Sequence, residues 1–168
     1  MKLIDSHAHL DNEQFDEDRA EVLERIKENL EFAVNIGYDI ESSRRSVKYA
    51  NENDFIYAVV GVHPIDIEGY SDEVEKELEE LARDEKVLAI GEIGLDYHWM
   101  TQPKEVQLKF FRRQMELARR VGKPVVIHSR DAMEDTLTVL KEFPDVGGIF
   151  HCYPGSVESA KDVLVIYY

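Results

Sequence analysis

Short apolar runs alternate with longer amphipathic stretches along the whole chain, and this alternation restricts the possible folds more than any other feature. The runs are rich in β-branched or aromatic residues and lie at 3–4, 32–36, 56–62, 87–90, 124–127 and 147–150. They are apolar without strict alternation, as are parallel strands that are covered on both faces. We therefore expect each run to form a buried strand, and the apolar run at 163–168 to form a last one.

The stretches between these runs have the spacing of amphipathic helices. They span residues 16–30, 42–53, 72–84, 103–121 and 131–143. Pro103 suits the first turn of its helix, and Asp131 with Glu134 has the spacing of a capping box. Strands and helices that alternate in this way build a parallel sheet or a barrel through right-handed crossovers.

The number of strands indicates an incomplete barrel. A closed (β/α)8 barrel has eight strands in typically ~250 residues, whereas this chain has 168 residues and six or seven candidate strands. We predict the α/β class and a (β/α) TIM-barrel type of fold with about six to seven of the eight strands. No linker interrupts the pattern, so residues 1–168 are expected to form a single domain, and its incomplete sheet would expose strand edges that allow an oligomer.

Composition excludes several classes of protein. The content of 43% hydrophobic and 33% charged residues is that of an ordinary globular protein. No apolar run approaches the ~20 residues of a membrane span, and the N-terminus lacks the pattern of a signal peptide. Cys152 is the single cysteine, which excludes an internal disulfide, and we expect it to be a small buried thiol. The cytoplasm is the expected compartment.

The net charge of −15 opposes general attraction to nucleic acid or acidic lipid. It does not oppose an enzyme that meets phosphate through a bound cation, because the cation is then the largest local charge. Any interaction with nucleic acid must therefore depend on a local site.

Five of the six histidines lie at or just after the end of a predicted strand, and a glutamate follows a further strand. These residues are His7, His9, His63, His128, His151 and Glu92. In parallel α/β folds the active site forms at the carboxyl ends of the strands, so these side chains are expected to meet at one rim.

Histidine with carboxylate is a ligand set for Zn²⁺, and with water it also suits Mn²⁺ or Mg²⁺. On an extended chain His7 and His9 point to the same side, ~6.6 Å apart, and could hold one ion. Glu92 could bridge to a second ion held by His128 and His151. Each residue alone is more often structural, but their shared placement favours two divalent metal ions that activate water for phosphoryl or acyl transfer.

Two further residues on this rim have different expected roles. Arg130 lies two residues beyond His128, where its planar cation could bind a phosphate. His98 lies in a loop beside Trp99, so we expect stacking or a surface position for it.

Five blocks, "DSHAHLD", "VGVHP", "AIGEIGLDY", "PVVIHSRDA" and "FHCYPGS", occur in this order. Together they resemble the TatD-type metal-dependent hydrolases, often called TatD deoxyribonucleases, of the amidohydrolase-like TIM-barrel superfamily. The resemblance implies a divalent-metal phosphodiesterase that acts on DNA, commonly from the 3′ end. It also implies that His7, His9 and bridging Glu92 hold one metal, and that Glu92, His128 and His151 hold the second.

The resemblance assigns His63 to the pocket and Asp5 to orienting the histidine strand. We accordingly expect catalytic roles for Glu92, His63 and Arg130, DNA as the substrate, and no protein partner. The chain departs from the family pattern at Ile65 and Pro154. It also lacks the family's last third, which carries an aspartate ligand of the first metal. Two alternatives therefore stay open: a small-molecule metallohydrolase of the amidohydrolase type, and an inactive metal-binding fragment.

Overall fold

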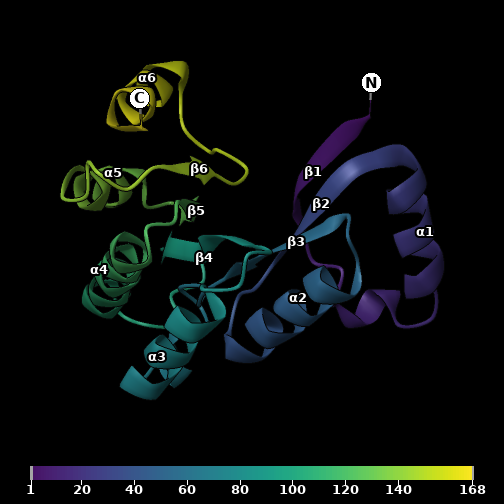
Figure 1. Ribbon diagram of the computed structural model, residues 1–168. Coiled ribbons are helices and arrows are strands. Elements are labelled where there is room, and N and C mark those ends of the chain that lie inside the picture. The colour runs from purple at the N-terminus through teal and green to yellow at the C-terminus, as the bar shows by residue number, and fades with distance from the viewer. Residues whose placement is uncertain (1, 168) are drawn as a thin grey trace.

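Six parallel strands pair in the order in which they occur in the chain, from β1 to β6. The computed structural model describes residues 2–167, and its sheet curls so that β1 and β6 form the two free edges (Figure 1). The strands are β1 (Leu3–Ala8), β2 (Leu30–Ile36), β3 (Ile56–Val60), β4 (Val87–Asp96), β5 (Val125–Arg130) and β6 (Gly148–Phe150). This arrangement confirms the predicted parallel, incomplete barrel.

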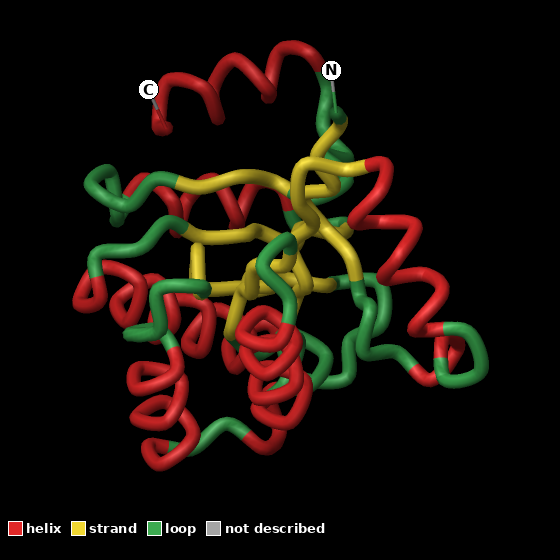
Figure 2. The backbone as a smooth tube through the Cα atoms, turned by 45° about the vertical axis from the view of Figure 1, so that its right-hand side comes forward, coloured by secondary structure: helices red, strands yellow, loops and turns green. Residues whose placement is uncertain are grey.

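A helix follows each strand, and the helices surround the sheet on its outer side (Figure 2). The α-helices are α1 (Arg19–Asn29), α2 (Ile40–Glu52), α3 (Asp72–Leu81), α4 (Lys104–Val121), α5 (Met133–Lys141) and α6 (Val157–Tyr167). Two short 3₁₀ helices, η1 (Glu13–Phe15) and η2 (Ile67–Gly69), lie in the connecting loops. No helix within residues 2–167 is long and apolar enough to cross a membrane.

The main core lies between the sheet and the helices. Its fully buried members include Ile56, Leu78, Ile90, Phe111 and Ile127. Burial of such apolar surface is the dominant favourable term in folding, at roughly 25 cal/mol per Å².

A second apolar cluster lies on the inner face of the sheet. It contains Val34, Ile36, Val59, Ala89 and Val126, so the strands are apolar on both faces as the sequence pattern indicates. This face borders an apolar hollow of about 360 Å³. At its two margins, Ile4 of β1 and Ile149 of β6 are 53% and 49% exposed. Association through these edges stays a prediction.

Two buried glutamines of α4 hold the ends of two strands. The side chain of Gln114 accepts from the backbone N–H of Val62 (2.8 Å) and donates to its carbonyl (2.9 Å). Gln107 makes the same pair of bonds with Asp96, at 2.8 and 2.9 Å. The two glutamines are seven residues apart, about two helical turns, and therefore share one face of α4. Through them α4 fixes the positions at which β4 and the segment after β3 reach the rim.

Three details of the sequence-based prediction are wrong. Residues 163–167 continue helix α6 instead of forming a strand, and residue 168 lies outside the described residues. A short apolar run fits either element, so its composition alone does not distinguish a strand from a helix. Helix α5 starts at Met133 without a side-chain cap, because Ala132 and not Asp131 takes the N-cap position; Asp131 precedes it with a left-handed φ of 54°. Strand β4 does not end near Ile90 but continues to Asp96.

Candidate metal centre

The histidines and the glutamate predicted to meet do come together at one rim of the sheet. His7 lies in β1, Glu92 in β4 and His128 in β5. His63 lies just after β3, and His151 directly follows β6. Parallel pairing brings Gly94 of β4 opposite His128, which sets Glu92 close to the histidine ring.

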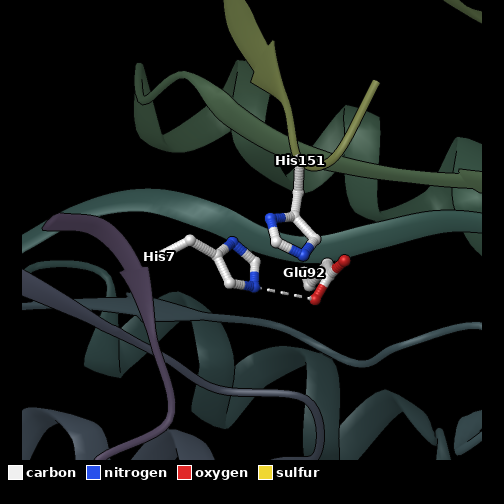
Figure 3. Close-up of side chains that lie close together, drawn as sticks. All are labelled: His7, Glu92 and His151. Atoms are coloured by element: carbon white, nitrogen blue, oxygen red, sulfur yellow. Dashed lines mark ion pairs between the residues drawn. The ribbon is translucent and has the colours of Figure 1, made fainter. Parts of the chain in front are cut away.

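The first group of candidate ligands contains His7, Glu92 and His151, each with a ligand atom within 4.8 Å of the others. Figure 3 shows the three side chains converging from β1, β4 and the end of β6. Glu92 Oε2 lies 3.3 Å from His7 Nε2. The rings of His7 and His151 stack with their centroids 3.5 Å apart.

The second group contains His63, Glu92 and His128. Glu92 Oε1 lies 3.1 Å from His128 Nδ1, and the rings of His63 and His128 meet edge to face at 4.2 Å. The carboxylate of Glu92 therefore belongs to both groups, with one oxygen toward each, which is the arrangement expected of a bridging ligand.

The grouping differs from the one expected from the sequence. His7 pairs with His151 rather than with His9, and His128 pairs with His63 rather than with His151. His9 belongs to neither group, and its Nδ1 lies 3.1 Å from the carbonyl oxygen of Ile36. Such a bond fixes the ring of a histidine and leaves Nε2 free, as it does in many metal ligands. The assignment of the ligands themselves stays a prediction.

An open cleft of about 390 Å³ leads to these side chains. His9, His63 and Glu92 line it together with Tyr38 and Asp66. A substrate group that enters the cleft therefore meets both histidines and the shared carboxylate.

The electrostatics of the centre favour a bound cation. Burial of Glu92, which is 4% exposed, opposes its ionisation, but the imidazoles of His128 and His7 outweigh burial and lower its pKa. Burial and the neighbouring His128 lower the pKa of His63 to about 4, so His63 is neutral at pH 7. Burial and the neighbouring His7 also lower the pKa of His151. The centre thus offers the ionised carboxylate of Glu92 beside the neutral imidazole of His63.

Both ring nitrogens of His7 are buried and have no hydrogen-bond partner among the described residues. The contact of Nε2 with Glu92 is close enough for an ion pair, but it does not meet the geometry of a hydrogen bond. Buried polar atoms are rarely left unpaired, because each one costs about 1–3 kcal/mol. A divalent cation at the Glu92 carboxylate would supply a partner for Nε2 of His7, and the imidazole and carboxylate donors suit Zn²⁺, Mn²⁺ or Mg²⁺.

Asp96 is the residue that the sequence-based analysis did not select. It is 1% exposed, and its Oδ2 lies 3.0 Å from His128 Nε2. The sequence pattern placed the end of the strand near Ile90, so Glu92 and Asp96 were not expected to lie on the same strand. The strand in fact continues to Asp96. On a strand that continues to residue 96, positions 92 and 96 share one face, and this spacing was the available signal.

The remaining candidates lie around the rim. Arg130 is exposed, and its guanidinium lies 5.7 Å from the ring of Trp99. His98 is exposed and meets Trp99 edge to face, which confirms the expected surface position. Asp5 Oδ1 accepts from the backbone N–H of His7, as expected of a residue that orients the histidine strand. Cys152 is exposed, so the prediction of a buried thiol is wrong; it lies in a turn with a left-handed φ of 43°.

Comparisons with known proteins identify the family of the chain. The sequence profile of the family described as TatD related DNase matches residues 4–168. An uncharacterized metal-dependent hydrolase, YabD of Bacillus subtilis, is 47% identical over 165 residues, which are 96% of this chain and 65% of the relative. A 3'-5' ssDNA/RNA exonuclease TatD of Rahnella is 37% identical over 152 residues, which are 88% of this chain and 58% of the relative.

Solved structures show the same fold. YJJV, a TatD homolog from Escherichia coli, superposes with a TM-score of 0.85 at 28% identity, over 98% of this chain and 65% of that one. An uncharacterized amidohydrolase from Saccharomyces cerevisiae superposes with a TM-score of 0.87 at 21% identity, over 99% of this chain and 66% of that one. The chain spans slightly less than two thirds of the length of the curated relatives that it matches.

Proposed function

The chain belongs to the family of TatD-related DNases, and on that premise we propose that it is a divalent-metal-dependent hydrolase that cleaves phosphodiester bonds of nucleic acid. The observation that carries the proposal is the buried carboxylate of Glu92, shared by two groups of imidazoles. In the related amidohydrolases a modified lysine often takes the bridging position. Glu92 is the candidate for that position here, which favours a phosphodiesterase over the alternative of a small-molecule amidohydrolase. The printed name of the Rahnella relative, a 3'-5' ssDNA/RNA exonuclease, supports a nucleic acid as the substrate.

The residues that would hold the cation are His7, His9, Glu92, His128 and His151. A bound cation supplies positive charge that stabilises the oxygens of a phosphoryl group in transfer and lowers the pKa of water. Glu92 is the carboxylate of this set, and its two oxygens face different imidazoles. It would therefore be the ligand shared by the two groups.

His63 would act on the substrate as a neutral hydrogen-bond donor. Its Nδ1 accepts from the backbone N–H of Ile65 at 3.3 Å. Because a neutral imidazole carries a single N–H, the proton of His63 then lies on Nε2. That N–H is available to a phosphate oxygen in the cleft, where it would stabilise the negative charge that develops during transfer.

Arg130 would bind a phosphate adjacent to the one that is cleaved. Its guanidinium is exposed and lies beside the ring of Trp99, which is 61% exposed and offers a face for stacking a base. With a net charge of −15, the chain needs such a local cation to hold nucleic acid, because its overall field is repulsive.

A direct test uses a 5′-labelled single-stranded oligonucleotide with Mn²⁺ or Mg²⁺, with and without a chelator. We expect metal-dependent release of nucleotides by the unaltered chain and a loss of about a hundredfold or more for Glu92→Gln. Glu75→Gln is the matched control, since it removes a partly buried carboxylate on α3 whose partners among the described residues are Arg113, Arg120 and Tyr70. Equal rates for Glu92→Gln and the control would overturn the proposal. Cleavage of amide or lactone substrates without phosphodiester cleavage would also overturn it.

A further inference from the structure

The side chain of Asp96 makes polar contacts that the pairing of β4 in the sheet does not require. Its Oδ1 accepts from the backbone N–H groups of His98 (2.9 Å) and Trp99 (2.8 Å). Its Oδ2 lies 3.0 Å from His128 Nε2. Its own backbone N–H and carbonyl are held by Gln107 of α4. The carboxylate is therefore held at both oxygens and presents Oδ2 to the ring of His128.

The ring of His128 lies between two carboxylates, with Nδ1 toward Glu92 and Nε2 toward Asp96. A neutral histidine has one N–H and one lone pair, and a cation binds at the lone pair. If a cation takes the place of a proton at Nδ1, on the side of Glu92, the one remaining proton of the ring lies on Nε2 and is donated to Asp96. In metal sites, such outer carboxylates set which nitrogen of a histidine carries the proton.

We propose that Asp96 is a positioning residue that keeps the proton of His128 on Nε2, so that Nδ1 is free to bind a divalent cation together with Glu92. This inference rests on the proposed metal site but not on the nature of the substrate. It gives a role to a residue outside the two groups of candidate ligands.

The contacts of Asp96 make one substitution informative. In Asp96→Asn the side-chain oxygen must face the N–H groups of His98 and Trp99, because the amide nitrogen cannot accept from them. The NH₂ group then faces His128 Nε2 and donates to it. The proton of neutral His128 consequently moves to Nδ1, the atom that faces Glu92, and occupies the position that the cation needs.

In Asp96→Ala we expect a larger loss of stability than in Asp96→Asn but a smaller loss of metal affinity. The alanine substitution removes the ties to the loop of His98 and Trp99 and leaves a small void, so it costs more stability than the isosteric Asn. It imposes no proton on either nitrogen of His128. The positioning role therefore predicts that Ala is the less stable variant and yet the one that binds metal more tightly. A merely structural role predicts that Ala is worse in both respects.

The test is calorimetric titration of the chain and its variants with Zn²⁺, with thermal unfolding measured alongside. We expect about 10–100-fold weaker binding for Asp96→Asn, a smaller loss for Asp96→Ala, and no change for the control Glu75→Gln. Unchanged affinity in Asp96→Asn, or a greater loss of affinity in Ala than in Asn, would overturn the proposal.

Nitrogen-15 NMR of the imidazoles provides a second measurement that does not need the Ala variant to fold. In the Zn²⁺-loaded chain, His128 should show a proton bonded to Nε2, and this signal should be lost in Asp96→Asn. A proton on Nδ1 of the unaltered, Zn²⁺-loaded chain would overturn the inference. If Zn²⁺ binds independently of Glu92, the proposed metal site fails instead, so the two failures are distinguishable.

Discussion

Glu92 Oε1 lies 3.1 Å from His128 Nδ1, although 36 positions separate the two residues in the chain. The contact depends on the close approach of β4 and β5, in which Gly94 pairs with His128. Gly94 has a φ of 141°, and a Cβ added there would clash with the carbonyl oxygen of His128. Gly94 thus allows Glu92 and His128, two members of the second group, to meet.

Gly94→Ala should therefore separate β4 from β5 and disrupt the pair of Glu92 and His128. We expect a loss of about 3 kcal/mol or more in the free energy of unfolding, measured by urea denaturation, because strain and a steric clash add. Gly69→Ala is the control, since an added Cβ there has no atom within 4 Å. Equal stabilities of the two variants would show that the close approach is not required.

Gln114→Leu tests whether α4 holds the segment that carries His63. The substitution leaves the buried N–H and carbonyl of Val62 without partners, so we expect a loss of about 2–4 kcal/mol in the free energy of unfolding. Leucine at the exposed position of Gln14 serves as the control and should stay within about 0.5 kcal/mol. A Gln114→Leu chain as stable as this control would show that Gln114 does not hold the segment of Val62 and His63 in place.

His63 should make the metal-free chain less stable in weak acid. Burial and His128 lower its pKa to about 4 in the folded state, against an ordinary value of 6.5. Between these values the unfolded chain binds more protons, so the free energy of unfolding falls as the pH falls from 6.5 to 4. The contribution of His63 amounts to about 3 kcal/mol at most.

His128 acts in the opposite direction, because the carboxylates of Glu92 and Asp96 outweigh burial and raise its pKa. The effect of His63 is therefore isolated by comparing variants at pH 7 and pH 4.5. His63→Gln should lose less stability over this range than the unaltered chain, whereas His98→Gln, an exposed site, should behave like the unaltered chain. The same pH dependence in both variants would refute the assignment.

Arg130→Ala should weaken the binding of single-stranded DNA with little effect on the chemical step. The guanidinium is exposed, so we expect about a fivefold rise in KM, equivalent to about 1 kcal/mol, and a kcat close to that of the unaltered chain. The salt dependence of binding should also decrease, since one phosphate contact is lost. Arg25→Ala, at an exposed position on α1, is the control, and a rise in KM that matches it would argue against a phosphate contact.

The rim could be predicted from the sequence because topology alone determines it. In a parallel β/α chain every strand ends on the same side, so residues after successive strands must meet there. His7, His63, Glu92, His128 and His151 follow this rule, and the structure brings their rings and carboxylate together.

The pairing within the rim could not be predicted in this way. Which imidazole faces which oxygen depends on side-chain rotamers and on partners such as the carbonyl of Ile36, which holds His9. Asp96 was missed because its role depends on the true length of β4. Cys152 was misplaced because the chain turns directly after His151 instead of staying extended.

The central claim is that Glu92 is a ligand for divalent cations at the two groups of histidines that share it. Calorimetric titration with Mn²⁺ tests it most directly, comparing the unaltered chain with Glu92→Gln and with the control Glu75→Gln. We predict saturable binding by the unaltered chain and the control, and an affinity at least about tenfold lower for Glu92→Gln. The same Mn²⁺ affinity in all three proteins would contradict the account.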